Sequence, residues 1–361
     1  MTPNILNREK VFRTLTTLDT FTDKSLKLEP KGPHLSGFHF TRDLLRAAAS
    51  NTYLETVGKR ADSIYLAIKK VPSSEVYWEY SKAVRIIGKR FDLSEQDVVL
   101  AIDHTAEEFY GDVQGFWIHG WTEEAGVTGK FKFLTCALVS FDVPQKVPLF
   151  SIPVHVGQNL AKNVVFCLSI VRSMVRSIKL VLLDRGFYSK ELIMALTDAG
   201  YPYLIFVPKN KKVAAELAQM AEGERKTIHY EFKLNKDRTV LRGETTLAFL
   251  KKVIDPSNGK TFDWAFATNQ EEINLDHIVA TYKGRWRIET GFRVQDEARI
   301  KSKSKEIRVR FFFFVYEQLL QLLWAVLYKE EVSFKRFLLE LSETCDSRLE
   351  KAERRAMRAN P

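Results

Sequence analysis

Two short apolar runs constrain the fold of this chain more than any other feature. Residues 98–102 (VVLAI) and 179–183 (KLVLL) each have the pattern of a strand buried on both faces, and each is followed at once by an aspartate, Asp103 and Asp184. Strands that are apolar on both faces belong to sheets that helices cover on both sides. We therefore expect an α/β protein in which Asp103 and Asp184 lie at the carboxyl ends of two strands.

The segments that follow predict a mixed sheet flanked by helices. Strand and helix patterns alternate up to residue 207, which indicates a mixed α/β arrangement. Within residues 208–268, a basic helix leads into two stretches of alternating hydrophobicity, and a turn at 255–259 precedes a further strand, which indicates an inserted β-rich subdomain. The predicted strands are 131–141, 148–156, 203–207, 229–234, 239–247 and 262–268, and the predicted helices are 164–175, 190–199 and 211–220.

The two ends of the chain differ in composition and in hydrophobic pattern. Helical periodicity in residues 41–50, 52–70 and 75–91 predicts an N-terminal helical domain, and its recurring basic residues fit either a DNA-binding module or a purely structural cap. The first 36 residues look looser, with a loop marked by Pro30, Gly32 and Pro33. From Ser342 on, the charged tail is expected to be a frayed, exposed helix. The resulting division is 1–95, 96–207, 208–268, 269–330 and 331–361.

The charge balance favours a polyanionic partner. The chain has 55 Lys and Arg against 45 Asp and Glu, a formal net charge of +10. Such a surplus suits nucleic acid first and an acidic membrane surface second. Three cysteines without paired spacing argue for a reducing compartment and against a disulfide framework or a cysteine zinc site.

The most apolar run, residues 311–328, does not have the composition of a membrane span. It carries Glu317, Gln318 and Gln321 near its middle, and a lipid-exposed helix rarely accepts so many polar groups. A buried amphipathic helix is the interpretation we adopt. We expect a soluble cytoplasmic protein with no membrane partner.

Residues 273–300 (INLDHIVATYKGRWRIETGFRVQDEARI) are predicted to form one long helix with an unusual face. Asn274 can cap its start, and no proline interrupts it. A core helix should have an apolar inner stripe. Here the residues within roughly 60° of one another are instead polar, and they are Tyr282, Arg285, Glu289, Arg293 and Asp296. The alternative interpretation is a solvated charged face with one tyrosine.

Asp103, Asp184 and Glu289 together suggest a metal site. Ligands of open α/β sheets bind outside the carboxyl ends of the strands, and neighbouring carboxylates repel one another unless a cation lies between them. Each aspartate alone is equally well explained as a cap or a turn former. With Glu289 on a packed helix, the set predicts a site for Mg²⁺ or Mn²⁺ of the kind used in two-metal phosphoryl transfer.

The sequence around these residues resembles the DDE transposases of prokaryotic insertion sequences. The segments are VVLAIDHT at Asp103, LVLLDRGFYS at Asp184 and YKGRWRIETGF at Glu289, and the last shows the family's spacing of Tyr, two residues, Arg, three residues and Glu. The resemblance covers residues 98–328. It implies a ribonuclease-H-like catalytic core with the β-rich insertion between Asp184 and Glu289.

The resemblance also implies an activity and roles. Asp103, Asp184 and Glu289 would bind two Mg²⁺ (or Mn²⁺) ions, and the enzyme would bind the terminal inverted repeats of its element, cleave the DNA ends and join the 3′-hydroxyl to target DNA. Arg285 would hold a phosphate and Tyr282 would bond nearby. A nucleoid-associated homodimer on double-stranded DNA is expected.

One position departs from the family pattern. The family often has a lysine seven residues after the glutamate, and this chain has Asp296 there. An aspartate does not hold phosphate, so either the contact has moved, with Arg293, Arg299 or Lys301 as candidates, or the activity is impaired. Two rival functions stay open: a two-metal nuclease without strand transfer, and a catalytically impaired DNA-binding descendant.

Four further residues carry weaker expectations for DNA contact. Trp264 is either a core aromatic or, as in related transposases, a residue that holds a flipped base. Lys209, Lys211 and Lys212 either line a DNA channel or solvate a loop. His104 either supports Asp103 or fills the turn.

Overall fold

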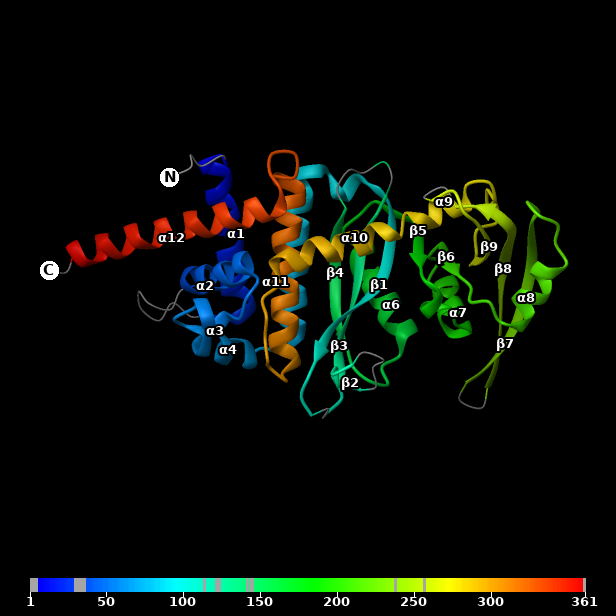
Figure 1. Cartoon of the computed structure of the whole chain (residues 1–361), viewed down its shortest axis with the longest axis horizontal. Coiled ribbons are helices and arrows are strands. Elements are labelled where there is room, and N and C mark those ends of the chain that lie inside the picture. Colours follow the sequence, from blue (N-terminus) through cyan, green and yellow to red (C-terminus); the bar gives the residue numbers. More distant parts are fainter. Residues whose placement is uncertain are drawn as a thin grey trace.

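One large mixed sheet runs through the middle of the molecule (Figure 1). The computed structural model describes residues 6–28, 37–112, 115–120, 125–140, 142, 146–236, 239–255 and 258–359. The strand order is β2-β3-β1-β5-β6-β9-β8-β7, with β4 paired to β3. The strands are β1 (Asp97–Phe109), β2 (His119–Gly120), β3 (Gly129–Leu138), β4 (Val147–Val154), β5 (Ser177–Leu183), β6 (Tyr203–Phe206), β7 (Arg225–Lys236), β8 (Thr239–Ile254) and β9 (Thr261–Thr268).

The predicted mixed α/β architecture is confirmed. Strand β5 runs parallel to both β1 and β6, whereas the other pairs are antiparallel. The helices of the sheet region are α5 (Ser73–Gly88), α6 (Leu160–Arg172), α7 (Lys190–Asp198), α8 (Lys211–Ala218), α9 (Ile278–Lys283), α10 (Trp286–Gln295) and α11 (Ile307–Leu327), with short 3-10 turns at Lys89–Phe91, Leu93–Glu95, Arg185–Phe187 and Asp296–Ala298. Ser189 caps α7 as its sequence suggests, by accepting the Leu192 N–H.

The strands predicted for the inserted subdomain extend the core sheet itself. Strand β9 pairs antiparallel with β6, and β8 and β7 follow it outward. Figure 1 shows this hairpin and α8 at the end of the sheet farthest from the N-terminal helices. A local hydrophobic pattern predicts strands but not their partners, so the sequence did not reveal this continuity. The boundaries 208–268 stay a prediction.

Two apolar cores lie on opposite faces of the sheet. The larger one joins alternate residues of the strands to α5, α6, α7, α11 and the N-terminal helices. The smaller one joins the other residues, such as Ala101 in β1 and Leu182 in β5, to Tyr282 of α9 and Ile288 of α10. The sheet is therefore covered on both sides, as strands of this composition require.

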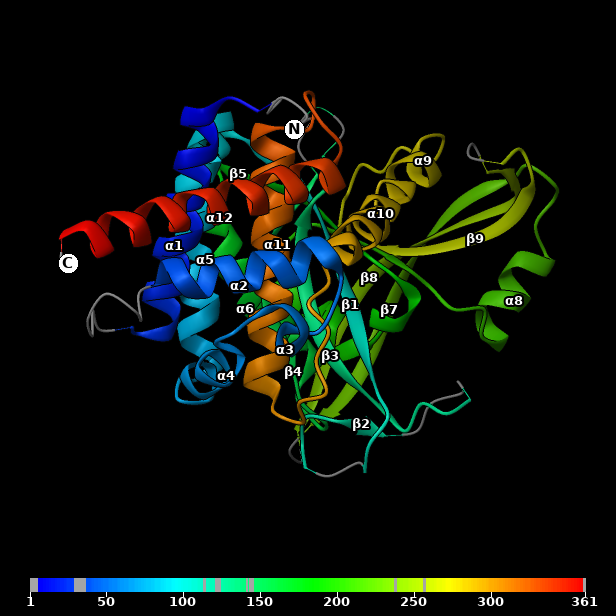
Figure 2. The same cartoon turned by 60° about the vertical axis from the view of Figure 1, so that its left-hand side comes forward.

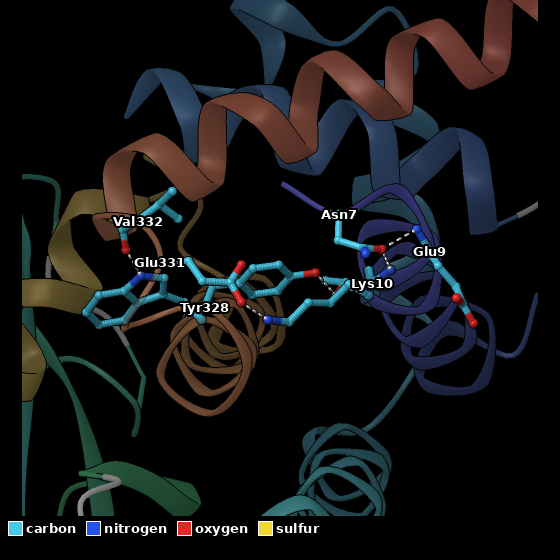
Figure 3. Close-up of polar contacts among 8 residues, drawn as sticks. Asn7, Glu9, Lys10, Tyr328, Glu331 and Val332 are labelled. Carbon is cyan, nitrogen blue, oxygen red and sulfur yellow. Dashed lines mark hydrogen bonds and ion pairs between the residues drawn. The ribbon is translucent and has the colours of Figure 1, made fainter. Parts of the chain in front are cut away.

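The N-terminal region contains a helix that was not predicted. Residues 8–26 form α1, whose first turn is capped by the Asn7 side chain, which accepts the N–H groups of Glu9 and Lys10 (2.9 and 3.2 Å; Figure 3). The expectation of looser structure over the first 36 residues is therefore wrong for this segment. Pro30, Gly32 and Pro33 lie outside the described residues. The other helices here are α2 (Gly37–Ser50), α3 (Leu54–Val57) and α4 (Ala61–Lys69).

Helix α1 is held against the end of α11. Lys10 forms an ion pair with Glu331, and the Tyr328 and Thr14 hydroxyls are 2.7 Å apart (Figure 3). Lys10 Nζ also lies 4.5 Å from the centroid of the Tyr328 ring. These contacts tie the first helix to the turn that leads into α12.

The C-terminal segment forms a long packed helix, α12 (Phe334–Ala359). Its Phe337, Leu341, Cys345 and Leu349 are buried, and the helix packs along α2 (Figure 2). The expectation of a frayed, exposed helix from Ser342 on is therefore wrong as far as Leu349. The spacing of four residues between these apolar side chains carries the signal.

Helix α11 passes through the middle of the larger core. By length and composition it is the one helix in the described part of the chain that would be able to cross a membrane, and 83% of its apolar window is buried inside the protein. Burial of this extent is what a core helix shows, as predicted. Cys136, Cys167 and Cys345 are buried free thiols.

Candidate active site

Asp103 and Asp184 lie at the same level on neighbouring strands. The parallel ladder between β1 and β5 ends with the pair Ile102 and Leu183, so the two aspartates are the next residue on each strand. Successive side chains of a strand point to opposite faces. Asp103 therefore shares a face with Ala101, and Asp184 shares that face with Leu182, and this is the face that α9 and α10 cover.

The predicted position of Asp103 needs one correction. Strand β1 does not end there but continues to Phe109, because residues 103–109 keep antiparallel partners in β3, starting with Asp103 and Thr135. Only the pairing with β5 ends at this level. Asp103 is therefore paired with β3 on one side and has no paired strand residue among the described residues on the β5 side. Asp184 follows the last residue of β5, and its side chain accepts the Gly186 N–H (2.8 Å).

Glu289 reaches Asp103 through an arginine. Helix α10 carries Glu289 over the shared face, and Arg285 lies four residues earlier. Arg285 Nη1 donates to Asp103 Oδ2 at 2.8 Å, and its Nη2 donates to Glu289 Oε1 at 2.7 Å. The guanidinium is buried, while 43% of the Glu289 side chain is exposed. One cation thus bridges two of the three predicted carboxylates.

The long helix predicted over residues 273–300 is interrupted. Helices α9 and α10 are separated at Gly284 and Arg285, and a 3-10 turn at Asp296–Ala298 ends the segment. Hydrogen bonds of the i to i−3 type replace the helical ones, from Arg285 N to Tyr282 O (2.9 Å) and from Ile288 N to Arg285 O (2.9 Å). Arg285 and Tyr282 nevertheless stay neighbours, with the guanidinium carbon 5.8 Å from the ring centroid.

Asn274 does not cap this helix as predicted. Its side chain accepts the Asp276 N–H at 2.9 Å and so forms a turn before α9, which begins at Ile278. Asparagine makes such local turns as readily as it makes helix caps. Asn274 therefore lies near the start of the helix, as predicted, but its side chain stabilises the preceding turn and does not cap the helix.

The electrostatics of the site are those of crowded carboxylates. Burial raises the pKa of Asp103 to about 6; Arg285 opposes that shift, and the charges of Asp184 and Glu289 add to it. Burial likewise raises the pKa of Tyr282 to about 12. Asp103 therefore lies within the electrostatic influence of both other acids.

The donor set fits a hard divalent cation, although an arginine now lies among the carboxylates. Within the described ranges, no three Asp, Glu, His or Cys side chains are grouped closely enough to hold a metal ion. The reason is visible in the contacts, since Arg285 occupies the position between Asp103 and Glu289. Carboxylate oxygens are the ligands that Mg²⁺ and Mn²⁺ prefer, so a metal ion and the Arg285 guanidinium would compete for the same oxygens.

Arg293 and Asp296 do not join this group. Both are exposed, Arg293 on α10 and Asp296 in the 3-10 turn beyond it. The backbone oxygen of Asp296 accepts the Asn51 side-chain amide at 2.8 Å. Of the five polar residues predicted to share a helix face, Tyr282, Arg285 and Glu289 are therefore the three that lie together beside Asp103.

Trp264 is a core aromatic in this structure. It lies in β9 with 7% of its surface exposed, and its ring stacks on Phe266 at a centroid distance of 6.0 Å. Lys283 Nζ lies 5.8 Å from the same ring. A contact between Trp264 and a DNA base would require these neighbours to move.

The predicted DNA-contacting lysines gather at the start of α8. Lys209 forms an ion pair with Asp263 (3.2 Å), Lys212 lies 4.0 Å above the Tyr230 ring, and Lys211 is exposed. They belong to the outer, β7–β8 end of the sheet (Figure 1). Their role in DNA contact stays a prediction.

His104 lies on the face opposite to the carboxylates. Its ring stacks on Phe187 at 5.0 Å, and burial lowers its pKa to about 4. Its backbone N–H donates to Asp103 Oδ1 at 2.8 Å. His104 supports Asp103 through the backbone, and its side chain fills the other core.

Two residues that position α10 were missed at the sequence level. Arg287 donates to the backbone oxygens of Val139 and Ser140 (2.9 and 3.1 Å), and Gln321 of α11 donates to the Gly291 oxygen (2.8 Å). The signal was present for Gln321, a polar residue in a strongly apolar helix. The sequence did not predict which group the Gln321 side chain bonds to.

Comparisons with known proteins agree with this geometry. A family model described as the transposase DDE domain matches residues 96–324. The solved structure of a piggyBac transposase synaptic complex with hairpin DNA has a TM-score of 0.56 at 13% identity, over 93% of this chain and 78% of that one. At this identity the likeness concerns the fold alone, and it supports the ribonuclease-H-like core. No curated protein sequence matches the chain.

Proposed function

The chain belongs to the transposase DDE domain family, and on that premise we propose that it cleaves the DNA ends of its element and joins them to target DNA. The proposal includes binding of terminal inverted repeats, metal-dependent hydrolysis of a phosphodiester and attack by the freed 3′-hydroxyl. The observation that carries it is the level placement of Asp103 and Asp184 beneath the helix that bears Glu289.

In this proposal Asp103, Asp184 and Glu289 hold two divalent ions. Bound Mg²⁺ or Mn²⁺ would supply an activated water and charge stabilisation at the phosphorus. The carboxylates themselves fix where the scissile phosphate lies, at the open side of β1.

Arg285 is proposed to transfer from the carboxylates to the DNA phosphate. Its Nη atoms are engaged by Asp103 and Glu289, while its buried Nε–H finds no acceptor among the described residues. A guanidinium donates two parallel hydrogen bonds to a phosphate. Tyr282, packed beneath the guanidinium, would keep it oriented.

The wider biological setting is proposed on the family premise. Double-stranded DNA is the partner, a homodimer forms across paired ends, and the protein acts in the cytoplasm of a prokaryote. The similar solved structure is a complex with hairpin DNA by its title. The two rival functions, a nuclease without strand transfer and an impaired DNA-binding descendant, give different products in the assay below.

The test is cleavage of end-bearing duplex DNA with Mg²⁺ by the wild type and by Asp184→Asn. The variant should lose cleavage by about 10⁴-fold while it still binds the ends. Asp198→Asn, at an exposed position at the end of α7, is the matched control and should cleave normally. Retained cleavage in Asp184→Asn would refute the site. Cleavage without strand transfer would favour the nuclease, and binding without wild-type cleavage would favour the impaired descendant.

A further inference from the structure

A basic strip follows the catalytic helix. We give this name to residues 299–305, the extended link between α10 and α11 that carries Arg299, Lys301, Lys303 and Lys305. Figure 2 shows the link running beside α11 and past α3. The three lysines are exposed, whereas Ile300 is buried, so the link presents its charges on one side.

The strip is held rigidly in its extended form. The Lys301 N–H donates to the Thr52 oxygen (3.0 Å) in a bridge to the N-terminal helices, and Ile300 N–H donates to the buried Glu317 (2.7 Å). The Ser302 and Ser304 hydroxyls accept the N–H groups two residues ahead, both at 3.1 Å. The backbone that carries the lysines is therefore already ordered, so binding orders only their side chains.

A groove of about 490 Å³ opens beside the strip. Its other wall is the end of β1 with Glu107, Glu108 and Tyr110. Of the two acids, Glu107 is buried and paired with Arg310 (3.3 Å). The described lining therefore combines Arg299, three lysines and the paired Arg310 against two carboxylates, and it is positive. Lys305 also lines a second groove, with Arg308 of α11.

Both walls of the groove continue from elements of the catalytic site. Strand β1 leads from Asp103 to the wall at residues 107–109, and α10 leads from Glu289 to the strip. At about 3.3 Å per residue, the wall lies roughly 13 to 20 Å from Asp103. That is the length of about four to six base pairs of duplex DNA.

We propose that the basic strip binds the phosphate backbone of duplex DNA whose end lies in the catalytic site. The inference rests on the proposed function and extends it to a second contact region. Lysines two residues apart on an extended chain are about 6.6 Å apart. A single phosphate needs donors that converge on one point, whereas a row of separated charges matches a polyanion. The strip also supplies positive charge near the position where Asp296 replaces the family's usual lysine.

The test uses full-length protein with Asp184→Asn, so that DNA is not cut, and a 30-base-pair duplex of random sequence. The charge-removing variant is Lys301→Gln, Lys303→Gln and Lys305→Gln together. The control removes three charges from exposed side chains that lie far from the strip, at the other end of the β1–β5 ladder. Its substitutions are Lys89→Gln and Arg90→Gln, in the 3-10 turn before β1, and Lys179→Gln, near the start of β5. Dissociation constants are measured by fluorescence anisotropy between 50 and 200 mM salt.

The strip variant should bind about tenfold or more weakly at 0.1 M salt, with a salt slope shallower by about two to three. The control should shift less in both respects. Equal affinity and slope in the two variants would overturn the inference. Because the lysines are exposed, folding should persist, and Lys303→Glu alone gives a second measurement if the triple variant unfolds.

Two other outcomes are separable from these. Binding to phosphatidylserine vesicles that depends on the strip, with DNA binding unchanged, would assign the strip to a membrane surface and overturn the inference. Wild-type protein that binds DNA through the strip yet cleaves nothing with Mg²⁺ would refute the proposed catalysis and leave the strip supported. The binding measurement therefore does not depend on the activity.

Discussion

Helices α10 and α11 both place polar side chains where a packed helix should be apolar, and they use them in opposite ways. On α11, the side chains of Glu317, Gln318 and Gln321 are buried and bond to other parts of the protein. On α10, Glu289 is partly exposed, and Arg285 beside it keeps a buried Nε–H without an acceptor among the described residues. Polar groups that are satisfied internally support the fold, and polar groups left open mark the site.

The buried polar side chains of α11 attach α10 to the sheet. Glu317 accepts the Ile300 N–H (2.7 Å) and the Gln295 amide (3.4 Å), and Gln321 reaches the Gly291 oxygen. Gln318 accepts from Ser151 (2.8 Å) in β4. A helix that would otherwise be apolar thus sets the position of α10 relative to β3 and β4, and with it that of Glu289 over Asp103.

The largest effect on stability should come from the buried polar side chains of α11. Glu317→Ala leaves the Ile300 and Gln295 donors buried without an acceptor and should lower the free energy of unfolding by about 3 kcal/mol. Glu289→Ala removes one of three crowded acids and should change it by less than about 1 kcal/mol. Urea unfolding at neutral pH measures both. If Glu289→Ala were the more destabilising change, the contrast between the two helices would be wrong.

Arg285→Ala should have a smaller effect that depends on divalent ions. Without the guanidinium the three carboxylates face one another unshielded, so the free energy of unfolding should fall by about 2 kcal/mol in EDTA. Added Mn²⁺ should recover part of that loss, because a cation can take the same place. Thermal melting of the variant with and without Mn²⁺ is the measurement, and Arg287→Ala, whose guanidinium donates to the backbone oxygens of Val139 and Ser140, is the comparison. A loss that Mn²⁺ leaves unchanged would argue that Arg285 is only structural.

The smallest effect concerns the pH dependence of Glu317. Burial raises the pKa of this carboxyl well above its usual value, so the folded protein keeps a proton that the unfolded chain releases. Stability from this group is present below the unfolded pKa of about 4.5 and is lost as pH rises towards the folded pKa. Glu317→Gln should therefore match the wild type near pH 4 and exceed it by about 1 kcal/mol or more at pH 7.5.

Urea unfolding of both proteins at the two pH values checks this prediction. Glu306→Gln, at a partly exposed carboxylate at the start of α11, serves as the control and should show no such gain. A difference between Glu317→Gln and wild type that does not grow with pH would mean that the buried carboxyl is ionised in the folded protein.

The site was predictable where local pattern determines geometry. Apolar runs that end in Asp103 and Asp184 indicate buried strands, and the parallel register that the structure shows brings the two residues level. The spacing of Tyr282, Arg285 and Glu289 on a helix likewise survives the break between α9 and α10. These features depend on the side-chain periodicity of strands and helices, which residues close together in the sequence determine.

The remaining features depend on contacts between distant segments. The break at Gly284 arises where α9 and α10 pack on the sheet, although both residues at the break keep helical backbone angles. The pairing of β9 with β6, and the bridge from Lys301 to Tyr53, join segments far apart in the chain. The hydrophobic spacing of α12 is present in the sequence, but the many charged residues of the tail led to the prediction of an exposed helix.

The central claim is that Asp103, Asp184 and Glu289 form one metal site, and calorimetric titration with Mn²⁺ tests it most directly. We expect wild type to bind Mn²⁺, and Asp103→Asn, Asp184→Asn and Glu289→Gln each to weaken binding by at least about tenfold. Glu297→Gln, at an exposed acid just beyond α10, should bind as wild type does. Mn²⁺ affinity that is unchanged in all three carboxylate variants would contradict the account.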